Sequence, residues 1–147
     1  MRKGRKGTVA LSAELDREQR ARPAGIHADK KTILIYSPDL NFSFSLSMVF
    51  QDRYNVVTTS NPTMLESFAS TYNADLAIVD AVPSDRMLQQ IDSLKALRGK
   101  LPVIMTYVYD AREVRLDSAT RVHADAVLYK PFEADSVLSQ VECLLSV

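Results

Sequence analysis

The feature that most constrains this chain is a series of five short apolar runs that begins at Lys31. The first run reads KTILIY and the third reads DLAIV, and a segment with apolar residues at helical spacing follows each run. Runs this apolar are typical of strands buried on both faces, which a parallel sheet flanked by helices requires. The pattern predicts a doubly wound α/β fold of five strands and five helices, compatible with strand order 2-1-3-4-5.

The boundaries follow from the apolar runs and from capping residues. Asn61 is expected to cap the second helix, with Pro62 at its first position. The expected strands are 31–36, 54–58, 75–79, 101–105 and 125–129, and the expected helices are 42–53, 62–72, 85–97, 110–122 and 135–145.

Charge separates the first 29 residues from the rest of the 147-residue chain. Residues 1–29 hold seven Lys/Arg and four Asp/Glu, a net charge of +3, whereas residues 30–147 hold eleven and fourteen, a net charge of −3. We interpret 1–29 as a flexible basic tail and 30–147 as one domain. A basic arm that docks on an acidic partner is the alternative, but this segment has few apolar residues to bury.

Composition excludes several classes of protein. A single Cys cannot form an internal disulfide, and no apolar run approaches the roughly 20 residues that a membrane-spanning helix needs. The acidic domain does not favour nucleic acid as a partner. The basic start is followed by too short an apolar stretch for a signal peptide, so we expect a cytoplasmic protein without a membrane partner.

Two charged residues stand where a doubly wound sheet places its functional site, outside the carboxyl ends of its strands. Asp80 follows the third strand, and Lys130, followed by Pro131, ends the fifth. The two could form a structural ion pair. Alternatively, Asp80 is an acceptor nucleophile and Lys130 neutralises the charge that develops on it.

At these residues the chain resembles a response-regulator receiver domain of the CheY-like family, which has a flavodoxin-like fold. The segments TILIYSPD, ADLAIVDAVPSD, LPVIMTY and HADAVLYKPF carry the resemblance, which covers about four fifths of the chain. It implies that Asp80 accepts a phosphoryl group from a phosphohistidine, with Mg²⁺ beside it. It also implies that Lys130 contacts the phosphoryl oxygens, that a cis peptide precedes Pro131, and that the carbonyl of Val82 ligates the metal.

The chain departs from the family after the first strand, where two adjacent acids usually hold Mg²⁺. Ser37 and Pro38 stand there instead, and neither side chain replaces a carboxylate on this hard cation. Asp39, one residue further on, either swings in as a ligand beside Asp80 and Val82 or caps the next helix. We expect weak Mg²⁺ binding at most, and no other cofactor.

The fourth and fifth strands also depart from the family pattern. Alignment puts Tyr107 where the family has a Thr or Ser hydroxyl, and Thr106 one residue early, so either the strand ends early and Thr106 serves or the hydroxyl is absent. Val127 replaces the usual aromatic residue, with Tyr129 two residues later. Tyr107, Tyr109 and Tyr129 form a candidate partner-binding surface, since aromatics are enriched in interfaces.

These observations favour a stand-alone pseudo-receiver, a non-enzymatic interaction module in two-component signalling with weak or no Mg²⁺-dependent phosphorylation. Because the sequence ends with the fifth helix, we expect its output to come from docking onto a histidine kinase, a phosphotransfer protein or an output protein, with a homodimer as a further option. The alternative is a functional single-domain response regulator phosphorylated on Asp80. A flavodoxin-like small-ligand binder is disfavoured, because no phosphate cradle follows the strands.

Overall fold

A computed structural model of the chain describes residues 26–97 and 99–146. The predicted basic tail therefore lies outside the described residues, apart from residues 26–29. Residues from Lys31 onward form one compact unit.

Five parallel strands form one sheet in the order β2-β1-β3-β4-β5, which confirms the predicted fold class and strand order. All positions of the three central strands are buried, as the apolar runs predict. The strands are β1 (Thr32–Tyr36), β2 (Asn55–Thr59), β3 (Leu76–Asp80), β4 (Val103–Tyr107) and β5 (Ala126–Tyr129).

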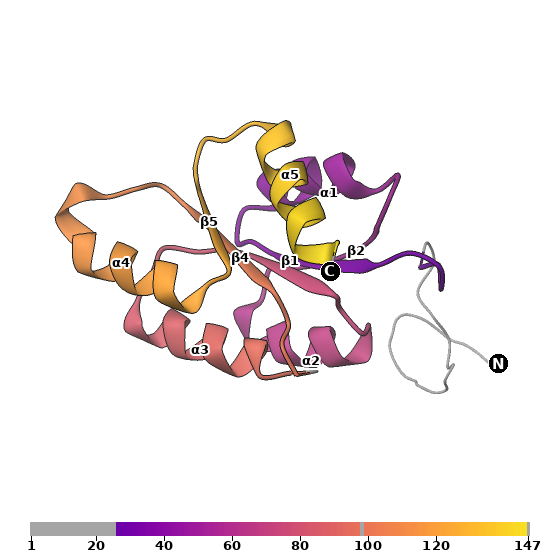
Figure 1. Cartoon of the computed structure of the whole chain (residues 1–147), viewed down its shortest axis with the longest axis horizontal. Coiled ribbons are helices and arrows are strands. Elements are labelled where there is room, and N and C mark those ends of the chain that lie inside the picture. Colours follow the sequence, from indigo (N-terminus) through magenta and orange to yellow (C-terminus); the bar gives the residue numbers. More distant parts are fainter. Residues whose placement is uncertain (1–25, 98, 147) are drawn as a thin grey trace. The chain divides into compact units, whose positions relative to one another are not determined.

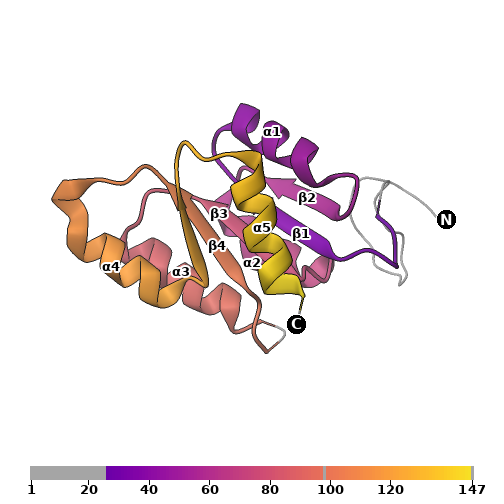
Figure 2. The ribbon, with the colours of Figure 1, turned by 45° about the horizontal axis from the view of Figure 1, so that its top comes forward.

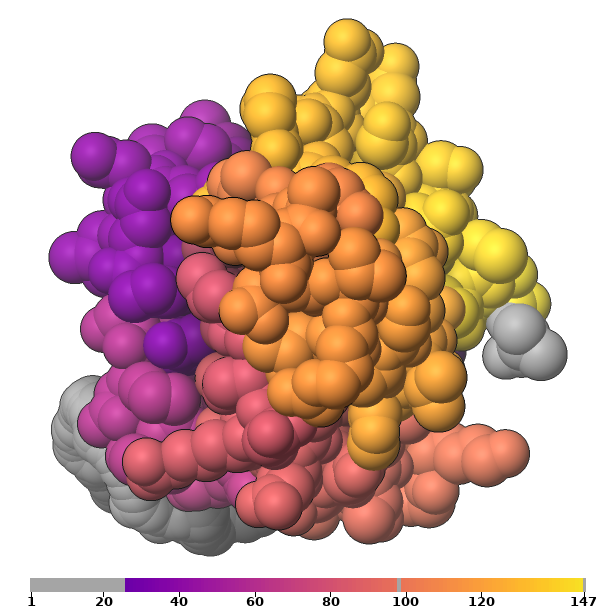
Figure 3. All heavy atoms as spheres, turned by 90° about the vertical axis from the view of Figure 1, so that its left-hand side faces the viewer, coloured from indigo at the N-terminus to yellow at the C-terminus, as the bar shows by residue number. Residues whose placement is uncertain are grey.

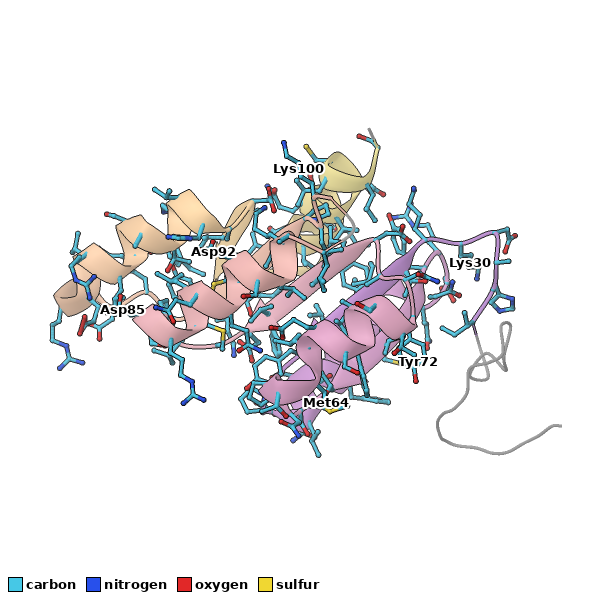
Figure 4. The ribbon with its side chains drawn as sticks, turned by 90° about the horizontal axis from the view of Figure 1, so that it is seen from below. Lys30, Met64, Tyr72, Asp85, Asp92 and Lys100 are labelled. Carbon is cyan, nitrogen blue, oxygen red and sulfur yellow. The ribbon has the colours of Figure 1, made fainter. Side chains whose placement is uncertain are left out.

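Helices cover both faces of the sheet. Figure 1 shows α1 and α5 on one face and α2, α3 and α4 on the other, and Figure 4 views the second group from below, with Asp85 and Asp92 on α3. The helices are α1 (Leu40–Phe50), α2 (Leu65–Thr71), α3 (Asp85–Lys95), α4 (Val114–His123) and α5 (Ala134–Leu145), and short 3₁₀ turns, η1 (Pro62–Met64) and η2 (Ala111–Glu113), precede α2 and α4.

The sheet divides the interior into two apolar cores, since alternate side chains of each strand point to opposite faces. One core lies under α2, α3 and α4, and the other lies under α1 and α5. The first includes Leu34, Val79, Met105, Leu65, Leu88 and Ile91, and the second includes Ile33, Ile78, Ile104, Leu46, Phe50 and Val137. None of the helices within the described ranges is long and apolar enough to cross a membrane.

Several boundaries differ from the predictions. Asn61 and Asp110 cap the 3₁₀ turns η1 and η2, so α2 and α4 begin at Leu65 and Val114 rather than near Pro62 and Asp110.

Two further differences have identifiable reasons. β4 was expected to begin at Leu101 but begins at Val103, after Pro102, whose lack of an N–H disfavours a central strand position. The first helix was expected from Phe42 but starts at Leu40, because the Asp39 side chain accepts hydrogen bonds from the first turn.

Candidate functional site

Asp80 lies at the carboxyl end of β3 and is 5% exposed. Three side chains donate hydrogen bonds to its carboxylate. Ser37 Oγ donates to Oδ2 at 2.7 Å, and Thr106 Oγ1 and Lys130 Nζ each donate to Oδ1 at 3.0 Å. The sheet therefore brings together four of the residues singled out from the sequence, and it satisfies a buried carboxylate with one cation and two hydroxyls.

Ser37 bridges two parts of the site. Its buried hydroxyl donates to Asp80 and accepts a hydrogen bond from the backbone N–H of Asp39 at 3.0 Å. The Ser37 backbone N–H bonds the carbonyl of Thr59 at the end of β2. The first strand's exit is thus tied to the carboxylate of Asp80 through a neutral hydroxyl rather than through a second acid.

Lys130 supplies the positive charge of the site. The Lys130–Pro131 peptide is cis, and the Lys130 backbone N–H bonds the carbonyl of Tyr107. The Lys130 side chain is about a quarter exposed, and its ammonium lies 4.3 Å from the centroid of the Phe42 ring. Phe42 meets Phe132 edge to face. An aromatic pair, Phe42 and Phe132, therefore lies beside the ion pair of Lys130 with Asp80.

Thr106 contacts Asp80, although the sequence analysis expected this only if the strand ended early. β4 does not end early, because it continues to Tyr107. Thr106 nevertheless pairs in register with Asp80 on the neighbouring strand, so both side chains point to the same face. The register opposite Asp80, rather than an early end of the strand, therefore places the Thr106 hydroxyl at the site.

The residues near Asp80 do not fit the magnesium site that the resemblance implies. Ser37 stands where a carboxylate would be needed, and its proton points at Asp80. Asp39 caps α1 by accepting from the backbone N–H groups of Asn41 and Phe42. Val82 lies two residues beyond Asp80 with its side chain exposed. In the parts of the chain that the structure describes, no group of three or more His, Cys, Asp or Glu side chains could hold a metal.

The three tyrosines of the predicted partner surface have different environments. Tyr107 is only 4% exposed, whereas Tyr109 is 44% exposed. The rings of Tyr107 and Tyr109 both pack edge to face against Tyr129. Tyr107 therefore belongs to the interior, and Tyr109 offers the most accessible ring of the three.

An acid on α4, not singled out from the sequence, organises these rings. Asp117 Oδ1 accepts hydrogen bonds from the hydroxyls of Tyr107 at 2.7 Å and Tyr129 at 2.8 Å. Arg121 forms an ion pair with Asp117 at 3.5 Å and donates to the Tyr129 hydroxyl at 2.6 Å. A tyrosine in a strand and an acid in the helix that follows have no fixed sequence spacing, so no motif would have revealed the pair.

The pKa values of these groups reflect their surroundings. Burial, and then the hydrogen bond to Asp117, raise the pKa of Tyr107 above its usual range. Burial alone would raise the pKa of Asp117, but hydrogen bonds from the two tyrosines and the charge of Arg121 outweigh it and lower that pKa. At the other site, burial and then the charge of Asp80 raise the pKa of Tyr36.

Comparison with known proteins gives structural matches only. No protein-family model and no curated protein sequence matches the chain. A putative pilus assembly protein (cpaE) from Burkholderia thailandensis matches at TM-score 0.66 and 23% identity, covering 80% of this chain and 99% of that one. Vibrio cholerae chemotaxis protein CheY4 matches at TM-score 0.66 and 18% identity, covering 79% and 99%. A response regulator receiver modulated diguanylate cyclase from Pelobacter carbinolicus matches at TM-score 0.60 and 26% identity, covering 79% and 92%.

These neighbours include response-regulator receiver domains, and the described domain has their CheY-like fold. The class is thus set by the sheet order and the five flanking helices.

Proposed function

We propose that this domain is a pseudo-receiver, a non-enzymatic protein–protein interaction module of two-component signalling that takes up little or no phosphoryl group with Mg²⁺. The observation that carries the proposal is the 2.7 Å hydrogen bond from Ser37 to Asp80. It supports the proposal because a proton donor occupies the carboxylate oxygen on the side where the family has metal-binding acids.

The charges around Asp80 also support weak Mg²⁺ binding. Asp80 and Lys130 form a neutral pair, and the neighbouring donors are uncharged hydroxyls. Mg²⁺ favours carboxylate ligands, and phosphoryl transfer depends on neutralising the charge of the transferred group. We therefore propose weak Mg²⁺ binding, a cytoplasmic location, and a histidine kinase, phosphotransfer protein or output protein as the partner.

The test is to incubate the full chain with Mg²⁺ and a small phosphodonor, or with beryllium fluoride, and to measure intact mass and amide NMR shifts near Asp80. We expect no phosphoryl adduct and no Mg²⁺-dependent shifts in the millimolar range. Ser37→Asp combined with Pro38→Asp should introduce Mg²⁺-dependent shifts, and adding Asp80→Ala to that variant should remove them.

A functional response regulator phosphorylated on Asp80 is the second candidate. The arrangement of Thr106 and Lys130, each 3.0 Å from the same Asp80 oxygen, favours it. A Mg²⁺-dependent mass gain of one phosphoryl group in the unaltered chain, absent from Asp80→Ala, would establish this candidate and refute the pseudo-receiver.

A further inference from the structure

The outer side of α1 carries a row of exposed apolar side chains. Leu40 is 69% exposed, Phe44 is 67% exposed and Met48 is 52% exposed. Their spacing of four residues places them on one side of the helix, away from the side where Ser43, Leu46 and Phe50 are buried. We name Leu40, Phe44 and Met48 the α1 stripe. Contiguous apolar surface of this kind marks an interaction site more often than scattered single residues do.

The α1 stripe also lies on a helix that has no charge. None of the eleven residues of α1, LNFSFSLSMVF, is acidic or basic, whereas a surface helix usually carries charges on its outer face. By contrast, α3 carries Asp85, Arg86, Asp92 and Lys95. In Figure 2, α1 lies at the margin of the domain beside α5, and no other labelled helix covers its outer side. Figure 3 shows the purple atoms, which include α1, at one flank of this face, with the orange region that includes α4 next to them.

We propose that the α1 stripe binds the α1 stripe of a second copy of this chain, with the two helices antiparallel across a two-fold axis at Phe44. Positions 40 and 48 are equally spaced about position 44. A two-fold axis there places Phe44 against Phe44 of the second copy and Leu40 against its Met48. Such an interface is self-complementary, as closed dimers require.

Electrostatics favour this occupant over a charged partner. Two uncharged helices bring no like charges together. In an antiparallel pair, the positive N-terminal end of each helix dipole also lies beside the negative C-terminal end of the other, which is favourable. The side chain of Asp39, the nearest acid before α1, already caps the backbone of its own helix. Three apolar side chains per copy make a small contact, so we expect a weak dimer with a dissociation constant in the range of about 10–100 µM. The inference is independent of the proposed function, because it does not involve Asp80.

The first experiment measures the mass of the full chain by sedimentation velocity, from about 5 µM to about 500 µM. We expect the weight-average mass to rise from monomer toward dimer in this range. Phe44→Glu should weaken association by at least about tenfold, because it places two acids together at the axis. Val122→Glu is the matched control, since Val122 is an apolar residue on α4 that is 82% exposed, and it should dimerise like the unaltered chain.

A charge-swap pair tests the antiparallel register. Leu40→Lys and Met48→Glu should each weaken the dimer, whereas the double variant should restore it and make it sensitive to salt, because each new lysine then faces a new glutamate across the axis. The two introduced groups are two helical turns apart within one chain, too far to pair there. Circular dichroism confirms that each variant is folded.

Three results would overturn the proposal. One is an unaltered chain that stays monomeric throughout the concentration range, even if another protein binds α1. The second is equal weakening by Phe44→Glu and Val122→Glu. The third is a double variant that associates no better than either single variant.

Discussion

Two carboxylates in this molecule are held in similar ways but at different depths of the fold. Asp80, at the end of a central strand, accepts from two hydroxyls and an ammonium group. Asp117, on a helix, accepts from two phenols and pairs with a guanidinium group. The residues of the first arrangement lie at or next to the carboxyl ends of strands, whereas the second joins a strand to a helix through side-chain packing.

The two clusters meet at the end of β4. Thr106 and Tyr107 are neighbours in the strand, and they point to opposite faces of the sheet. Thr106 donates to Asp80 and Tyr107 donates to Asp117. Hydrogen bonds within the chain therefore hold the end of β4 on both faces of the sheet.

The largest expected loss of stability follows from removing the cation of the Asp80 cluster. Lys130→Met removes the only charge that faces the buried Asp80 carboxylate in the described contacts. We expect a loss of about 2–4 kcal/mol in the free energy of unfolding by urea, slightly below the figure for a fully buried pair because the ammonium is partly exposed. Arg112→Met, which breaks the exposed pair with Asp110, should leave the unfolding free energy unchanged within error. Equal small losses in both variants would contradict this account of the Asp80 site.

A smaller loss is expected at the second cluster. Asp117→Ala leaves the hydroxyls of Tyr107 and Tyr129 without their acceptor, and the first of these is buried. Leaving a buried polar group unsatisfied costs about 1–3 kcal/mol, and urea unfolding should show a loss of that size. Amide hydrogen exchange should accelerate in α4 more than in α3. Arg115→Ala, at an exposed and long ion pair on α4, is the control. Unchanged exchange in α4 after Asp117→Ala would show that the cluster does not hold that helix.

The fold and the position of Asp80 at the edge of the sheet could be predicted from the same sequence feature. Apolar, β-branched runs such as TILIY and LAIVD must be buried on both faces, and parallel strands place their carboxyl ends at one edge. Any polar residue at such an end, including Ser37 and Lys130, then falls into one small region. Sequence order alone therefore predicts that these residues meet.

Other parts of the site depended on tertiary detail. The direction of Thr106 follows from its register opposite Asp80, which no local pattern specifies. The role of Asp117 depends on where α4 packs, and that helix has a weak amphipathic pattern. The α1 stripe was not predicted, because the sequence does not show which apolar residues of this helix the sheet covers: Leu46 is buried, whereas Phe44 is exposed. These are contacts between elements, and single-sequence patterns describe elements one at a time.

The smallest expected effect is a dependence on pH that belongs to Asp117. Its pKa is lower in the folded chain than the ordinary value of about 3.9. The stabilisation that it provides is therefore fully present above that ordinary value and is lost as the pH falls through the lower folded pKa. Asp117→Asn keeps an acceptor for a tyrosine but has no charge to lose. The difference in unfolding free energy between the unaltered chain and Asp117→Asn should stay constant from neutral pH to about pH 5 and shrink below about pH 4. A difference that persists or grows in acid would mean that the carboxylate charge does not stabilise this cluster.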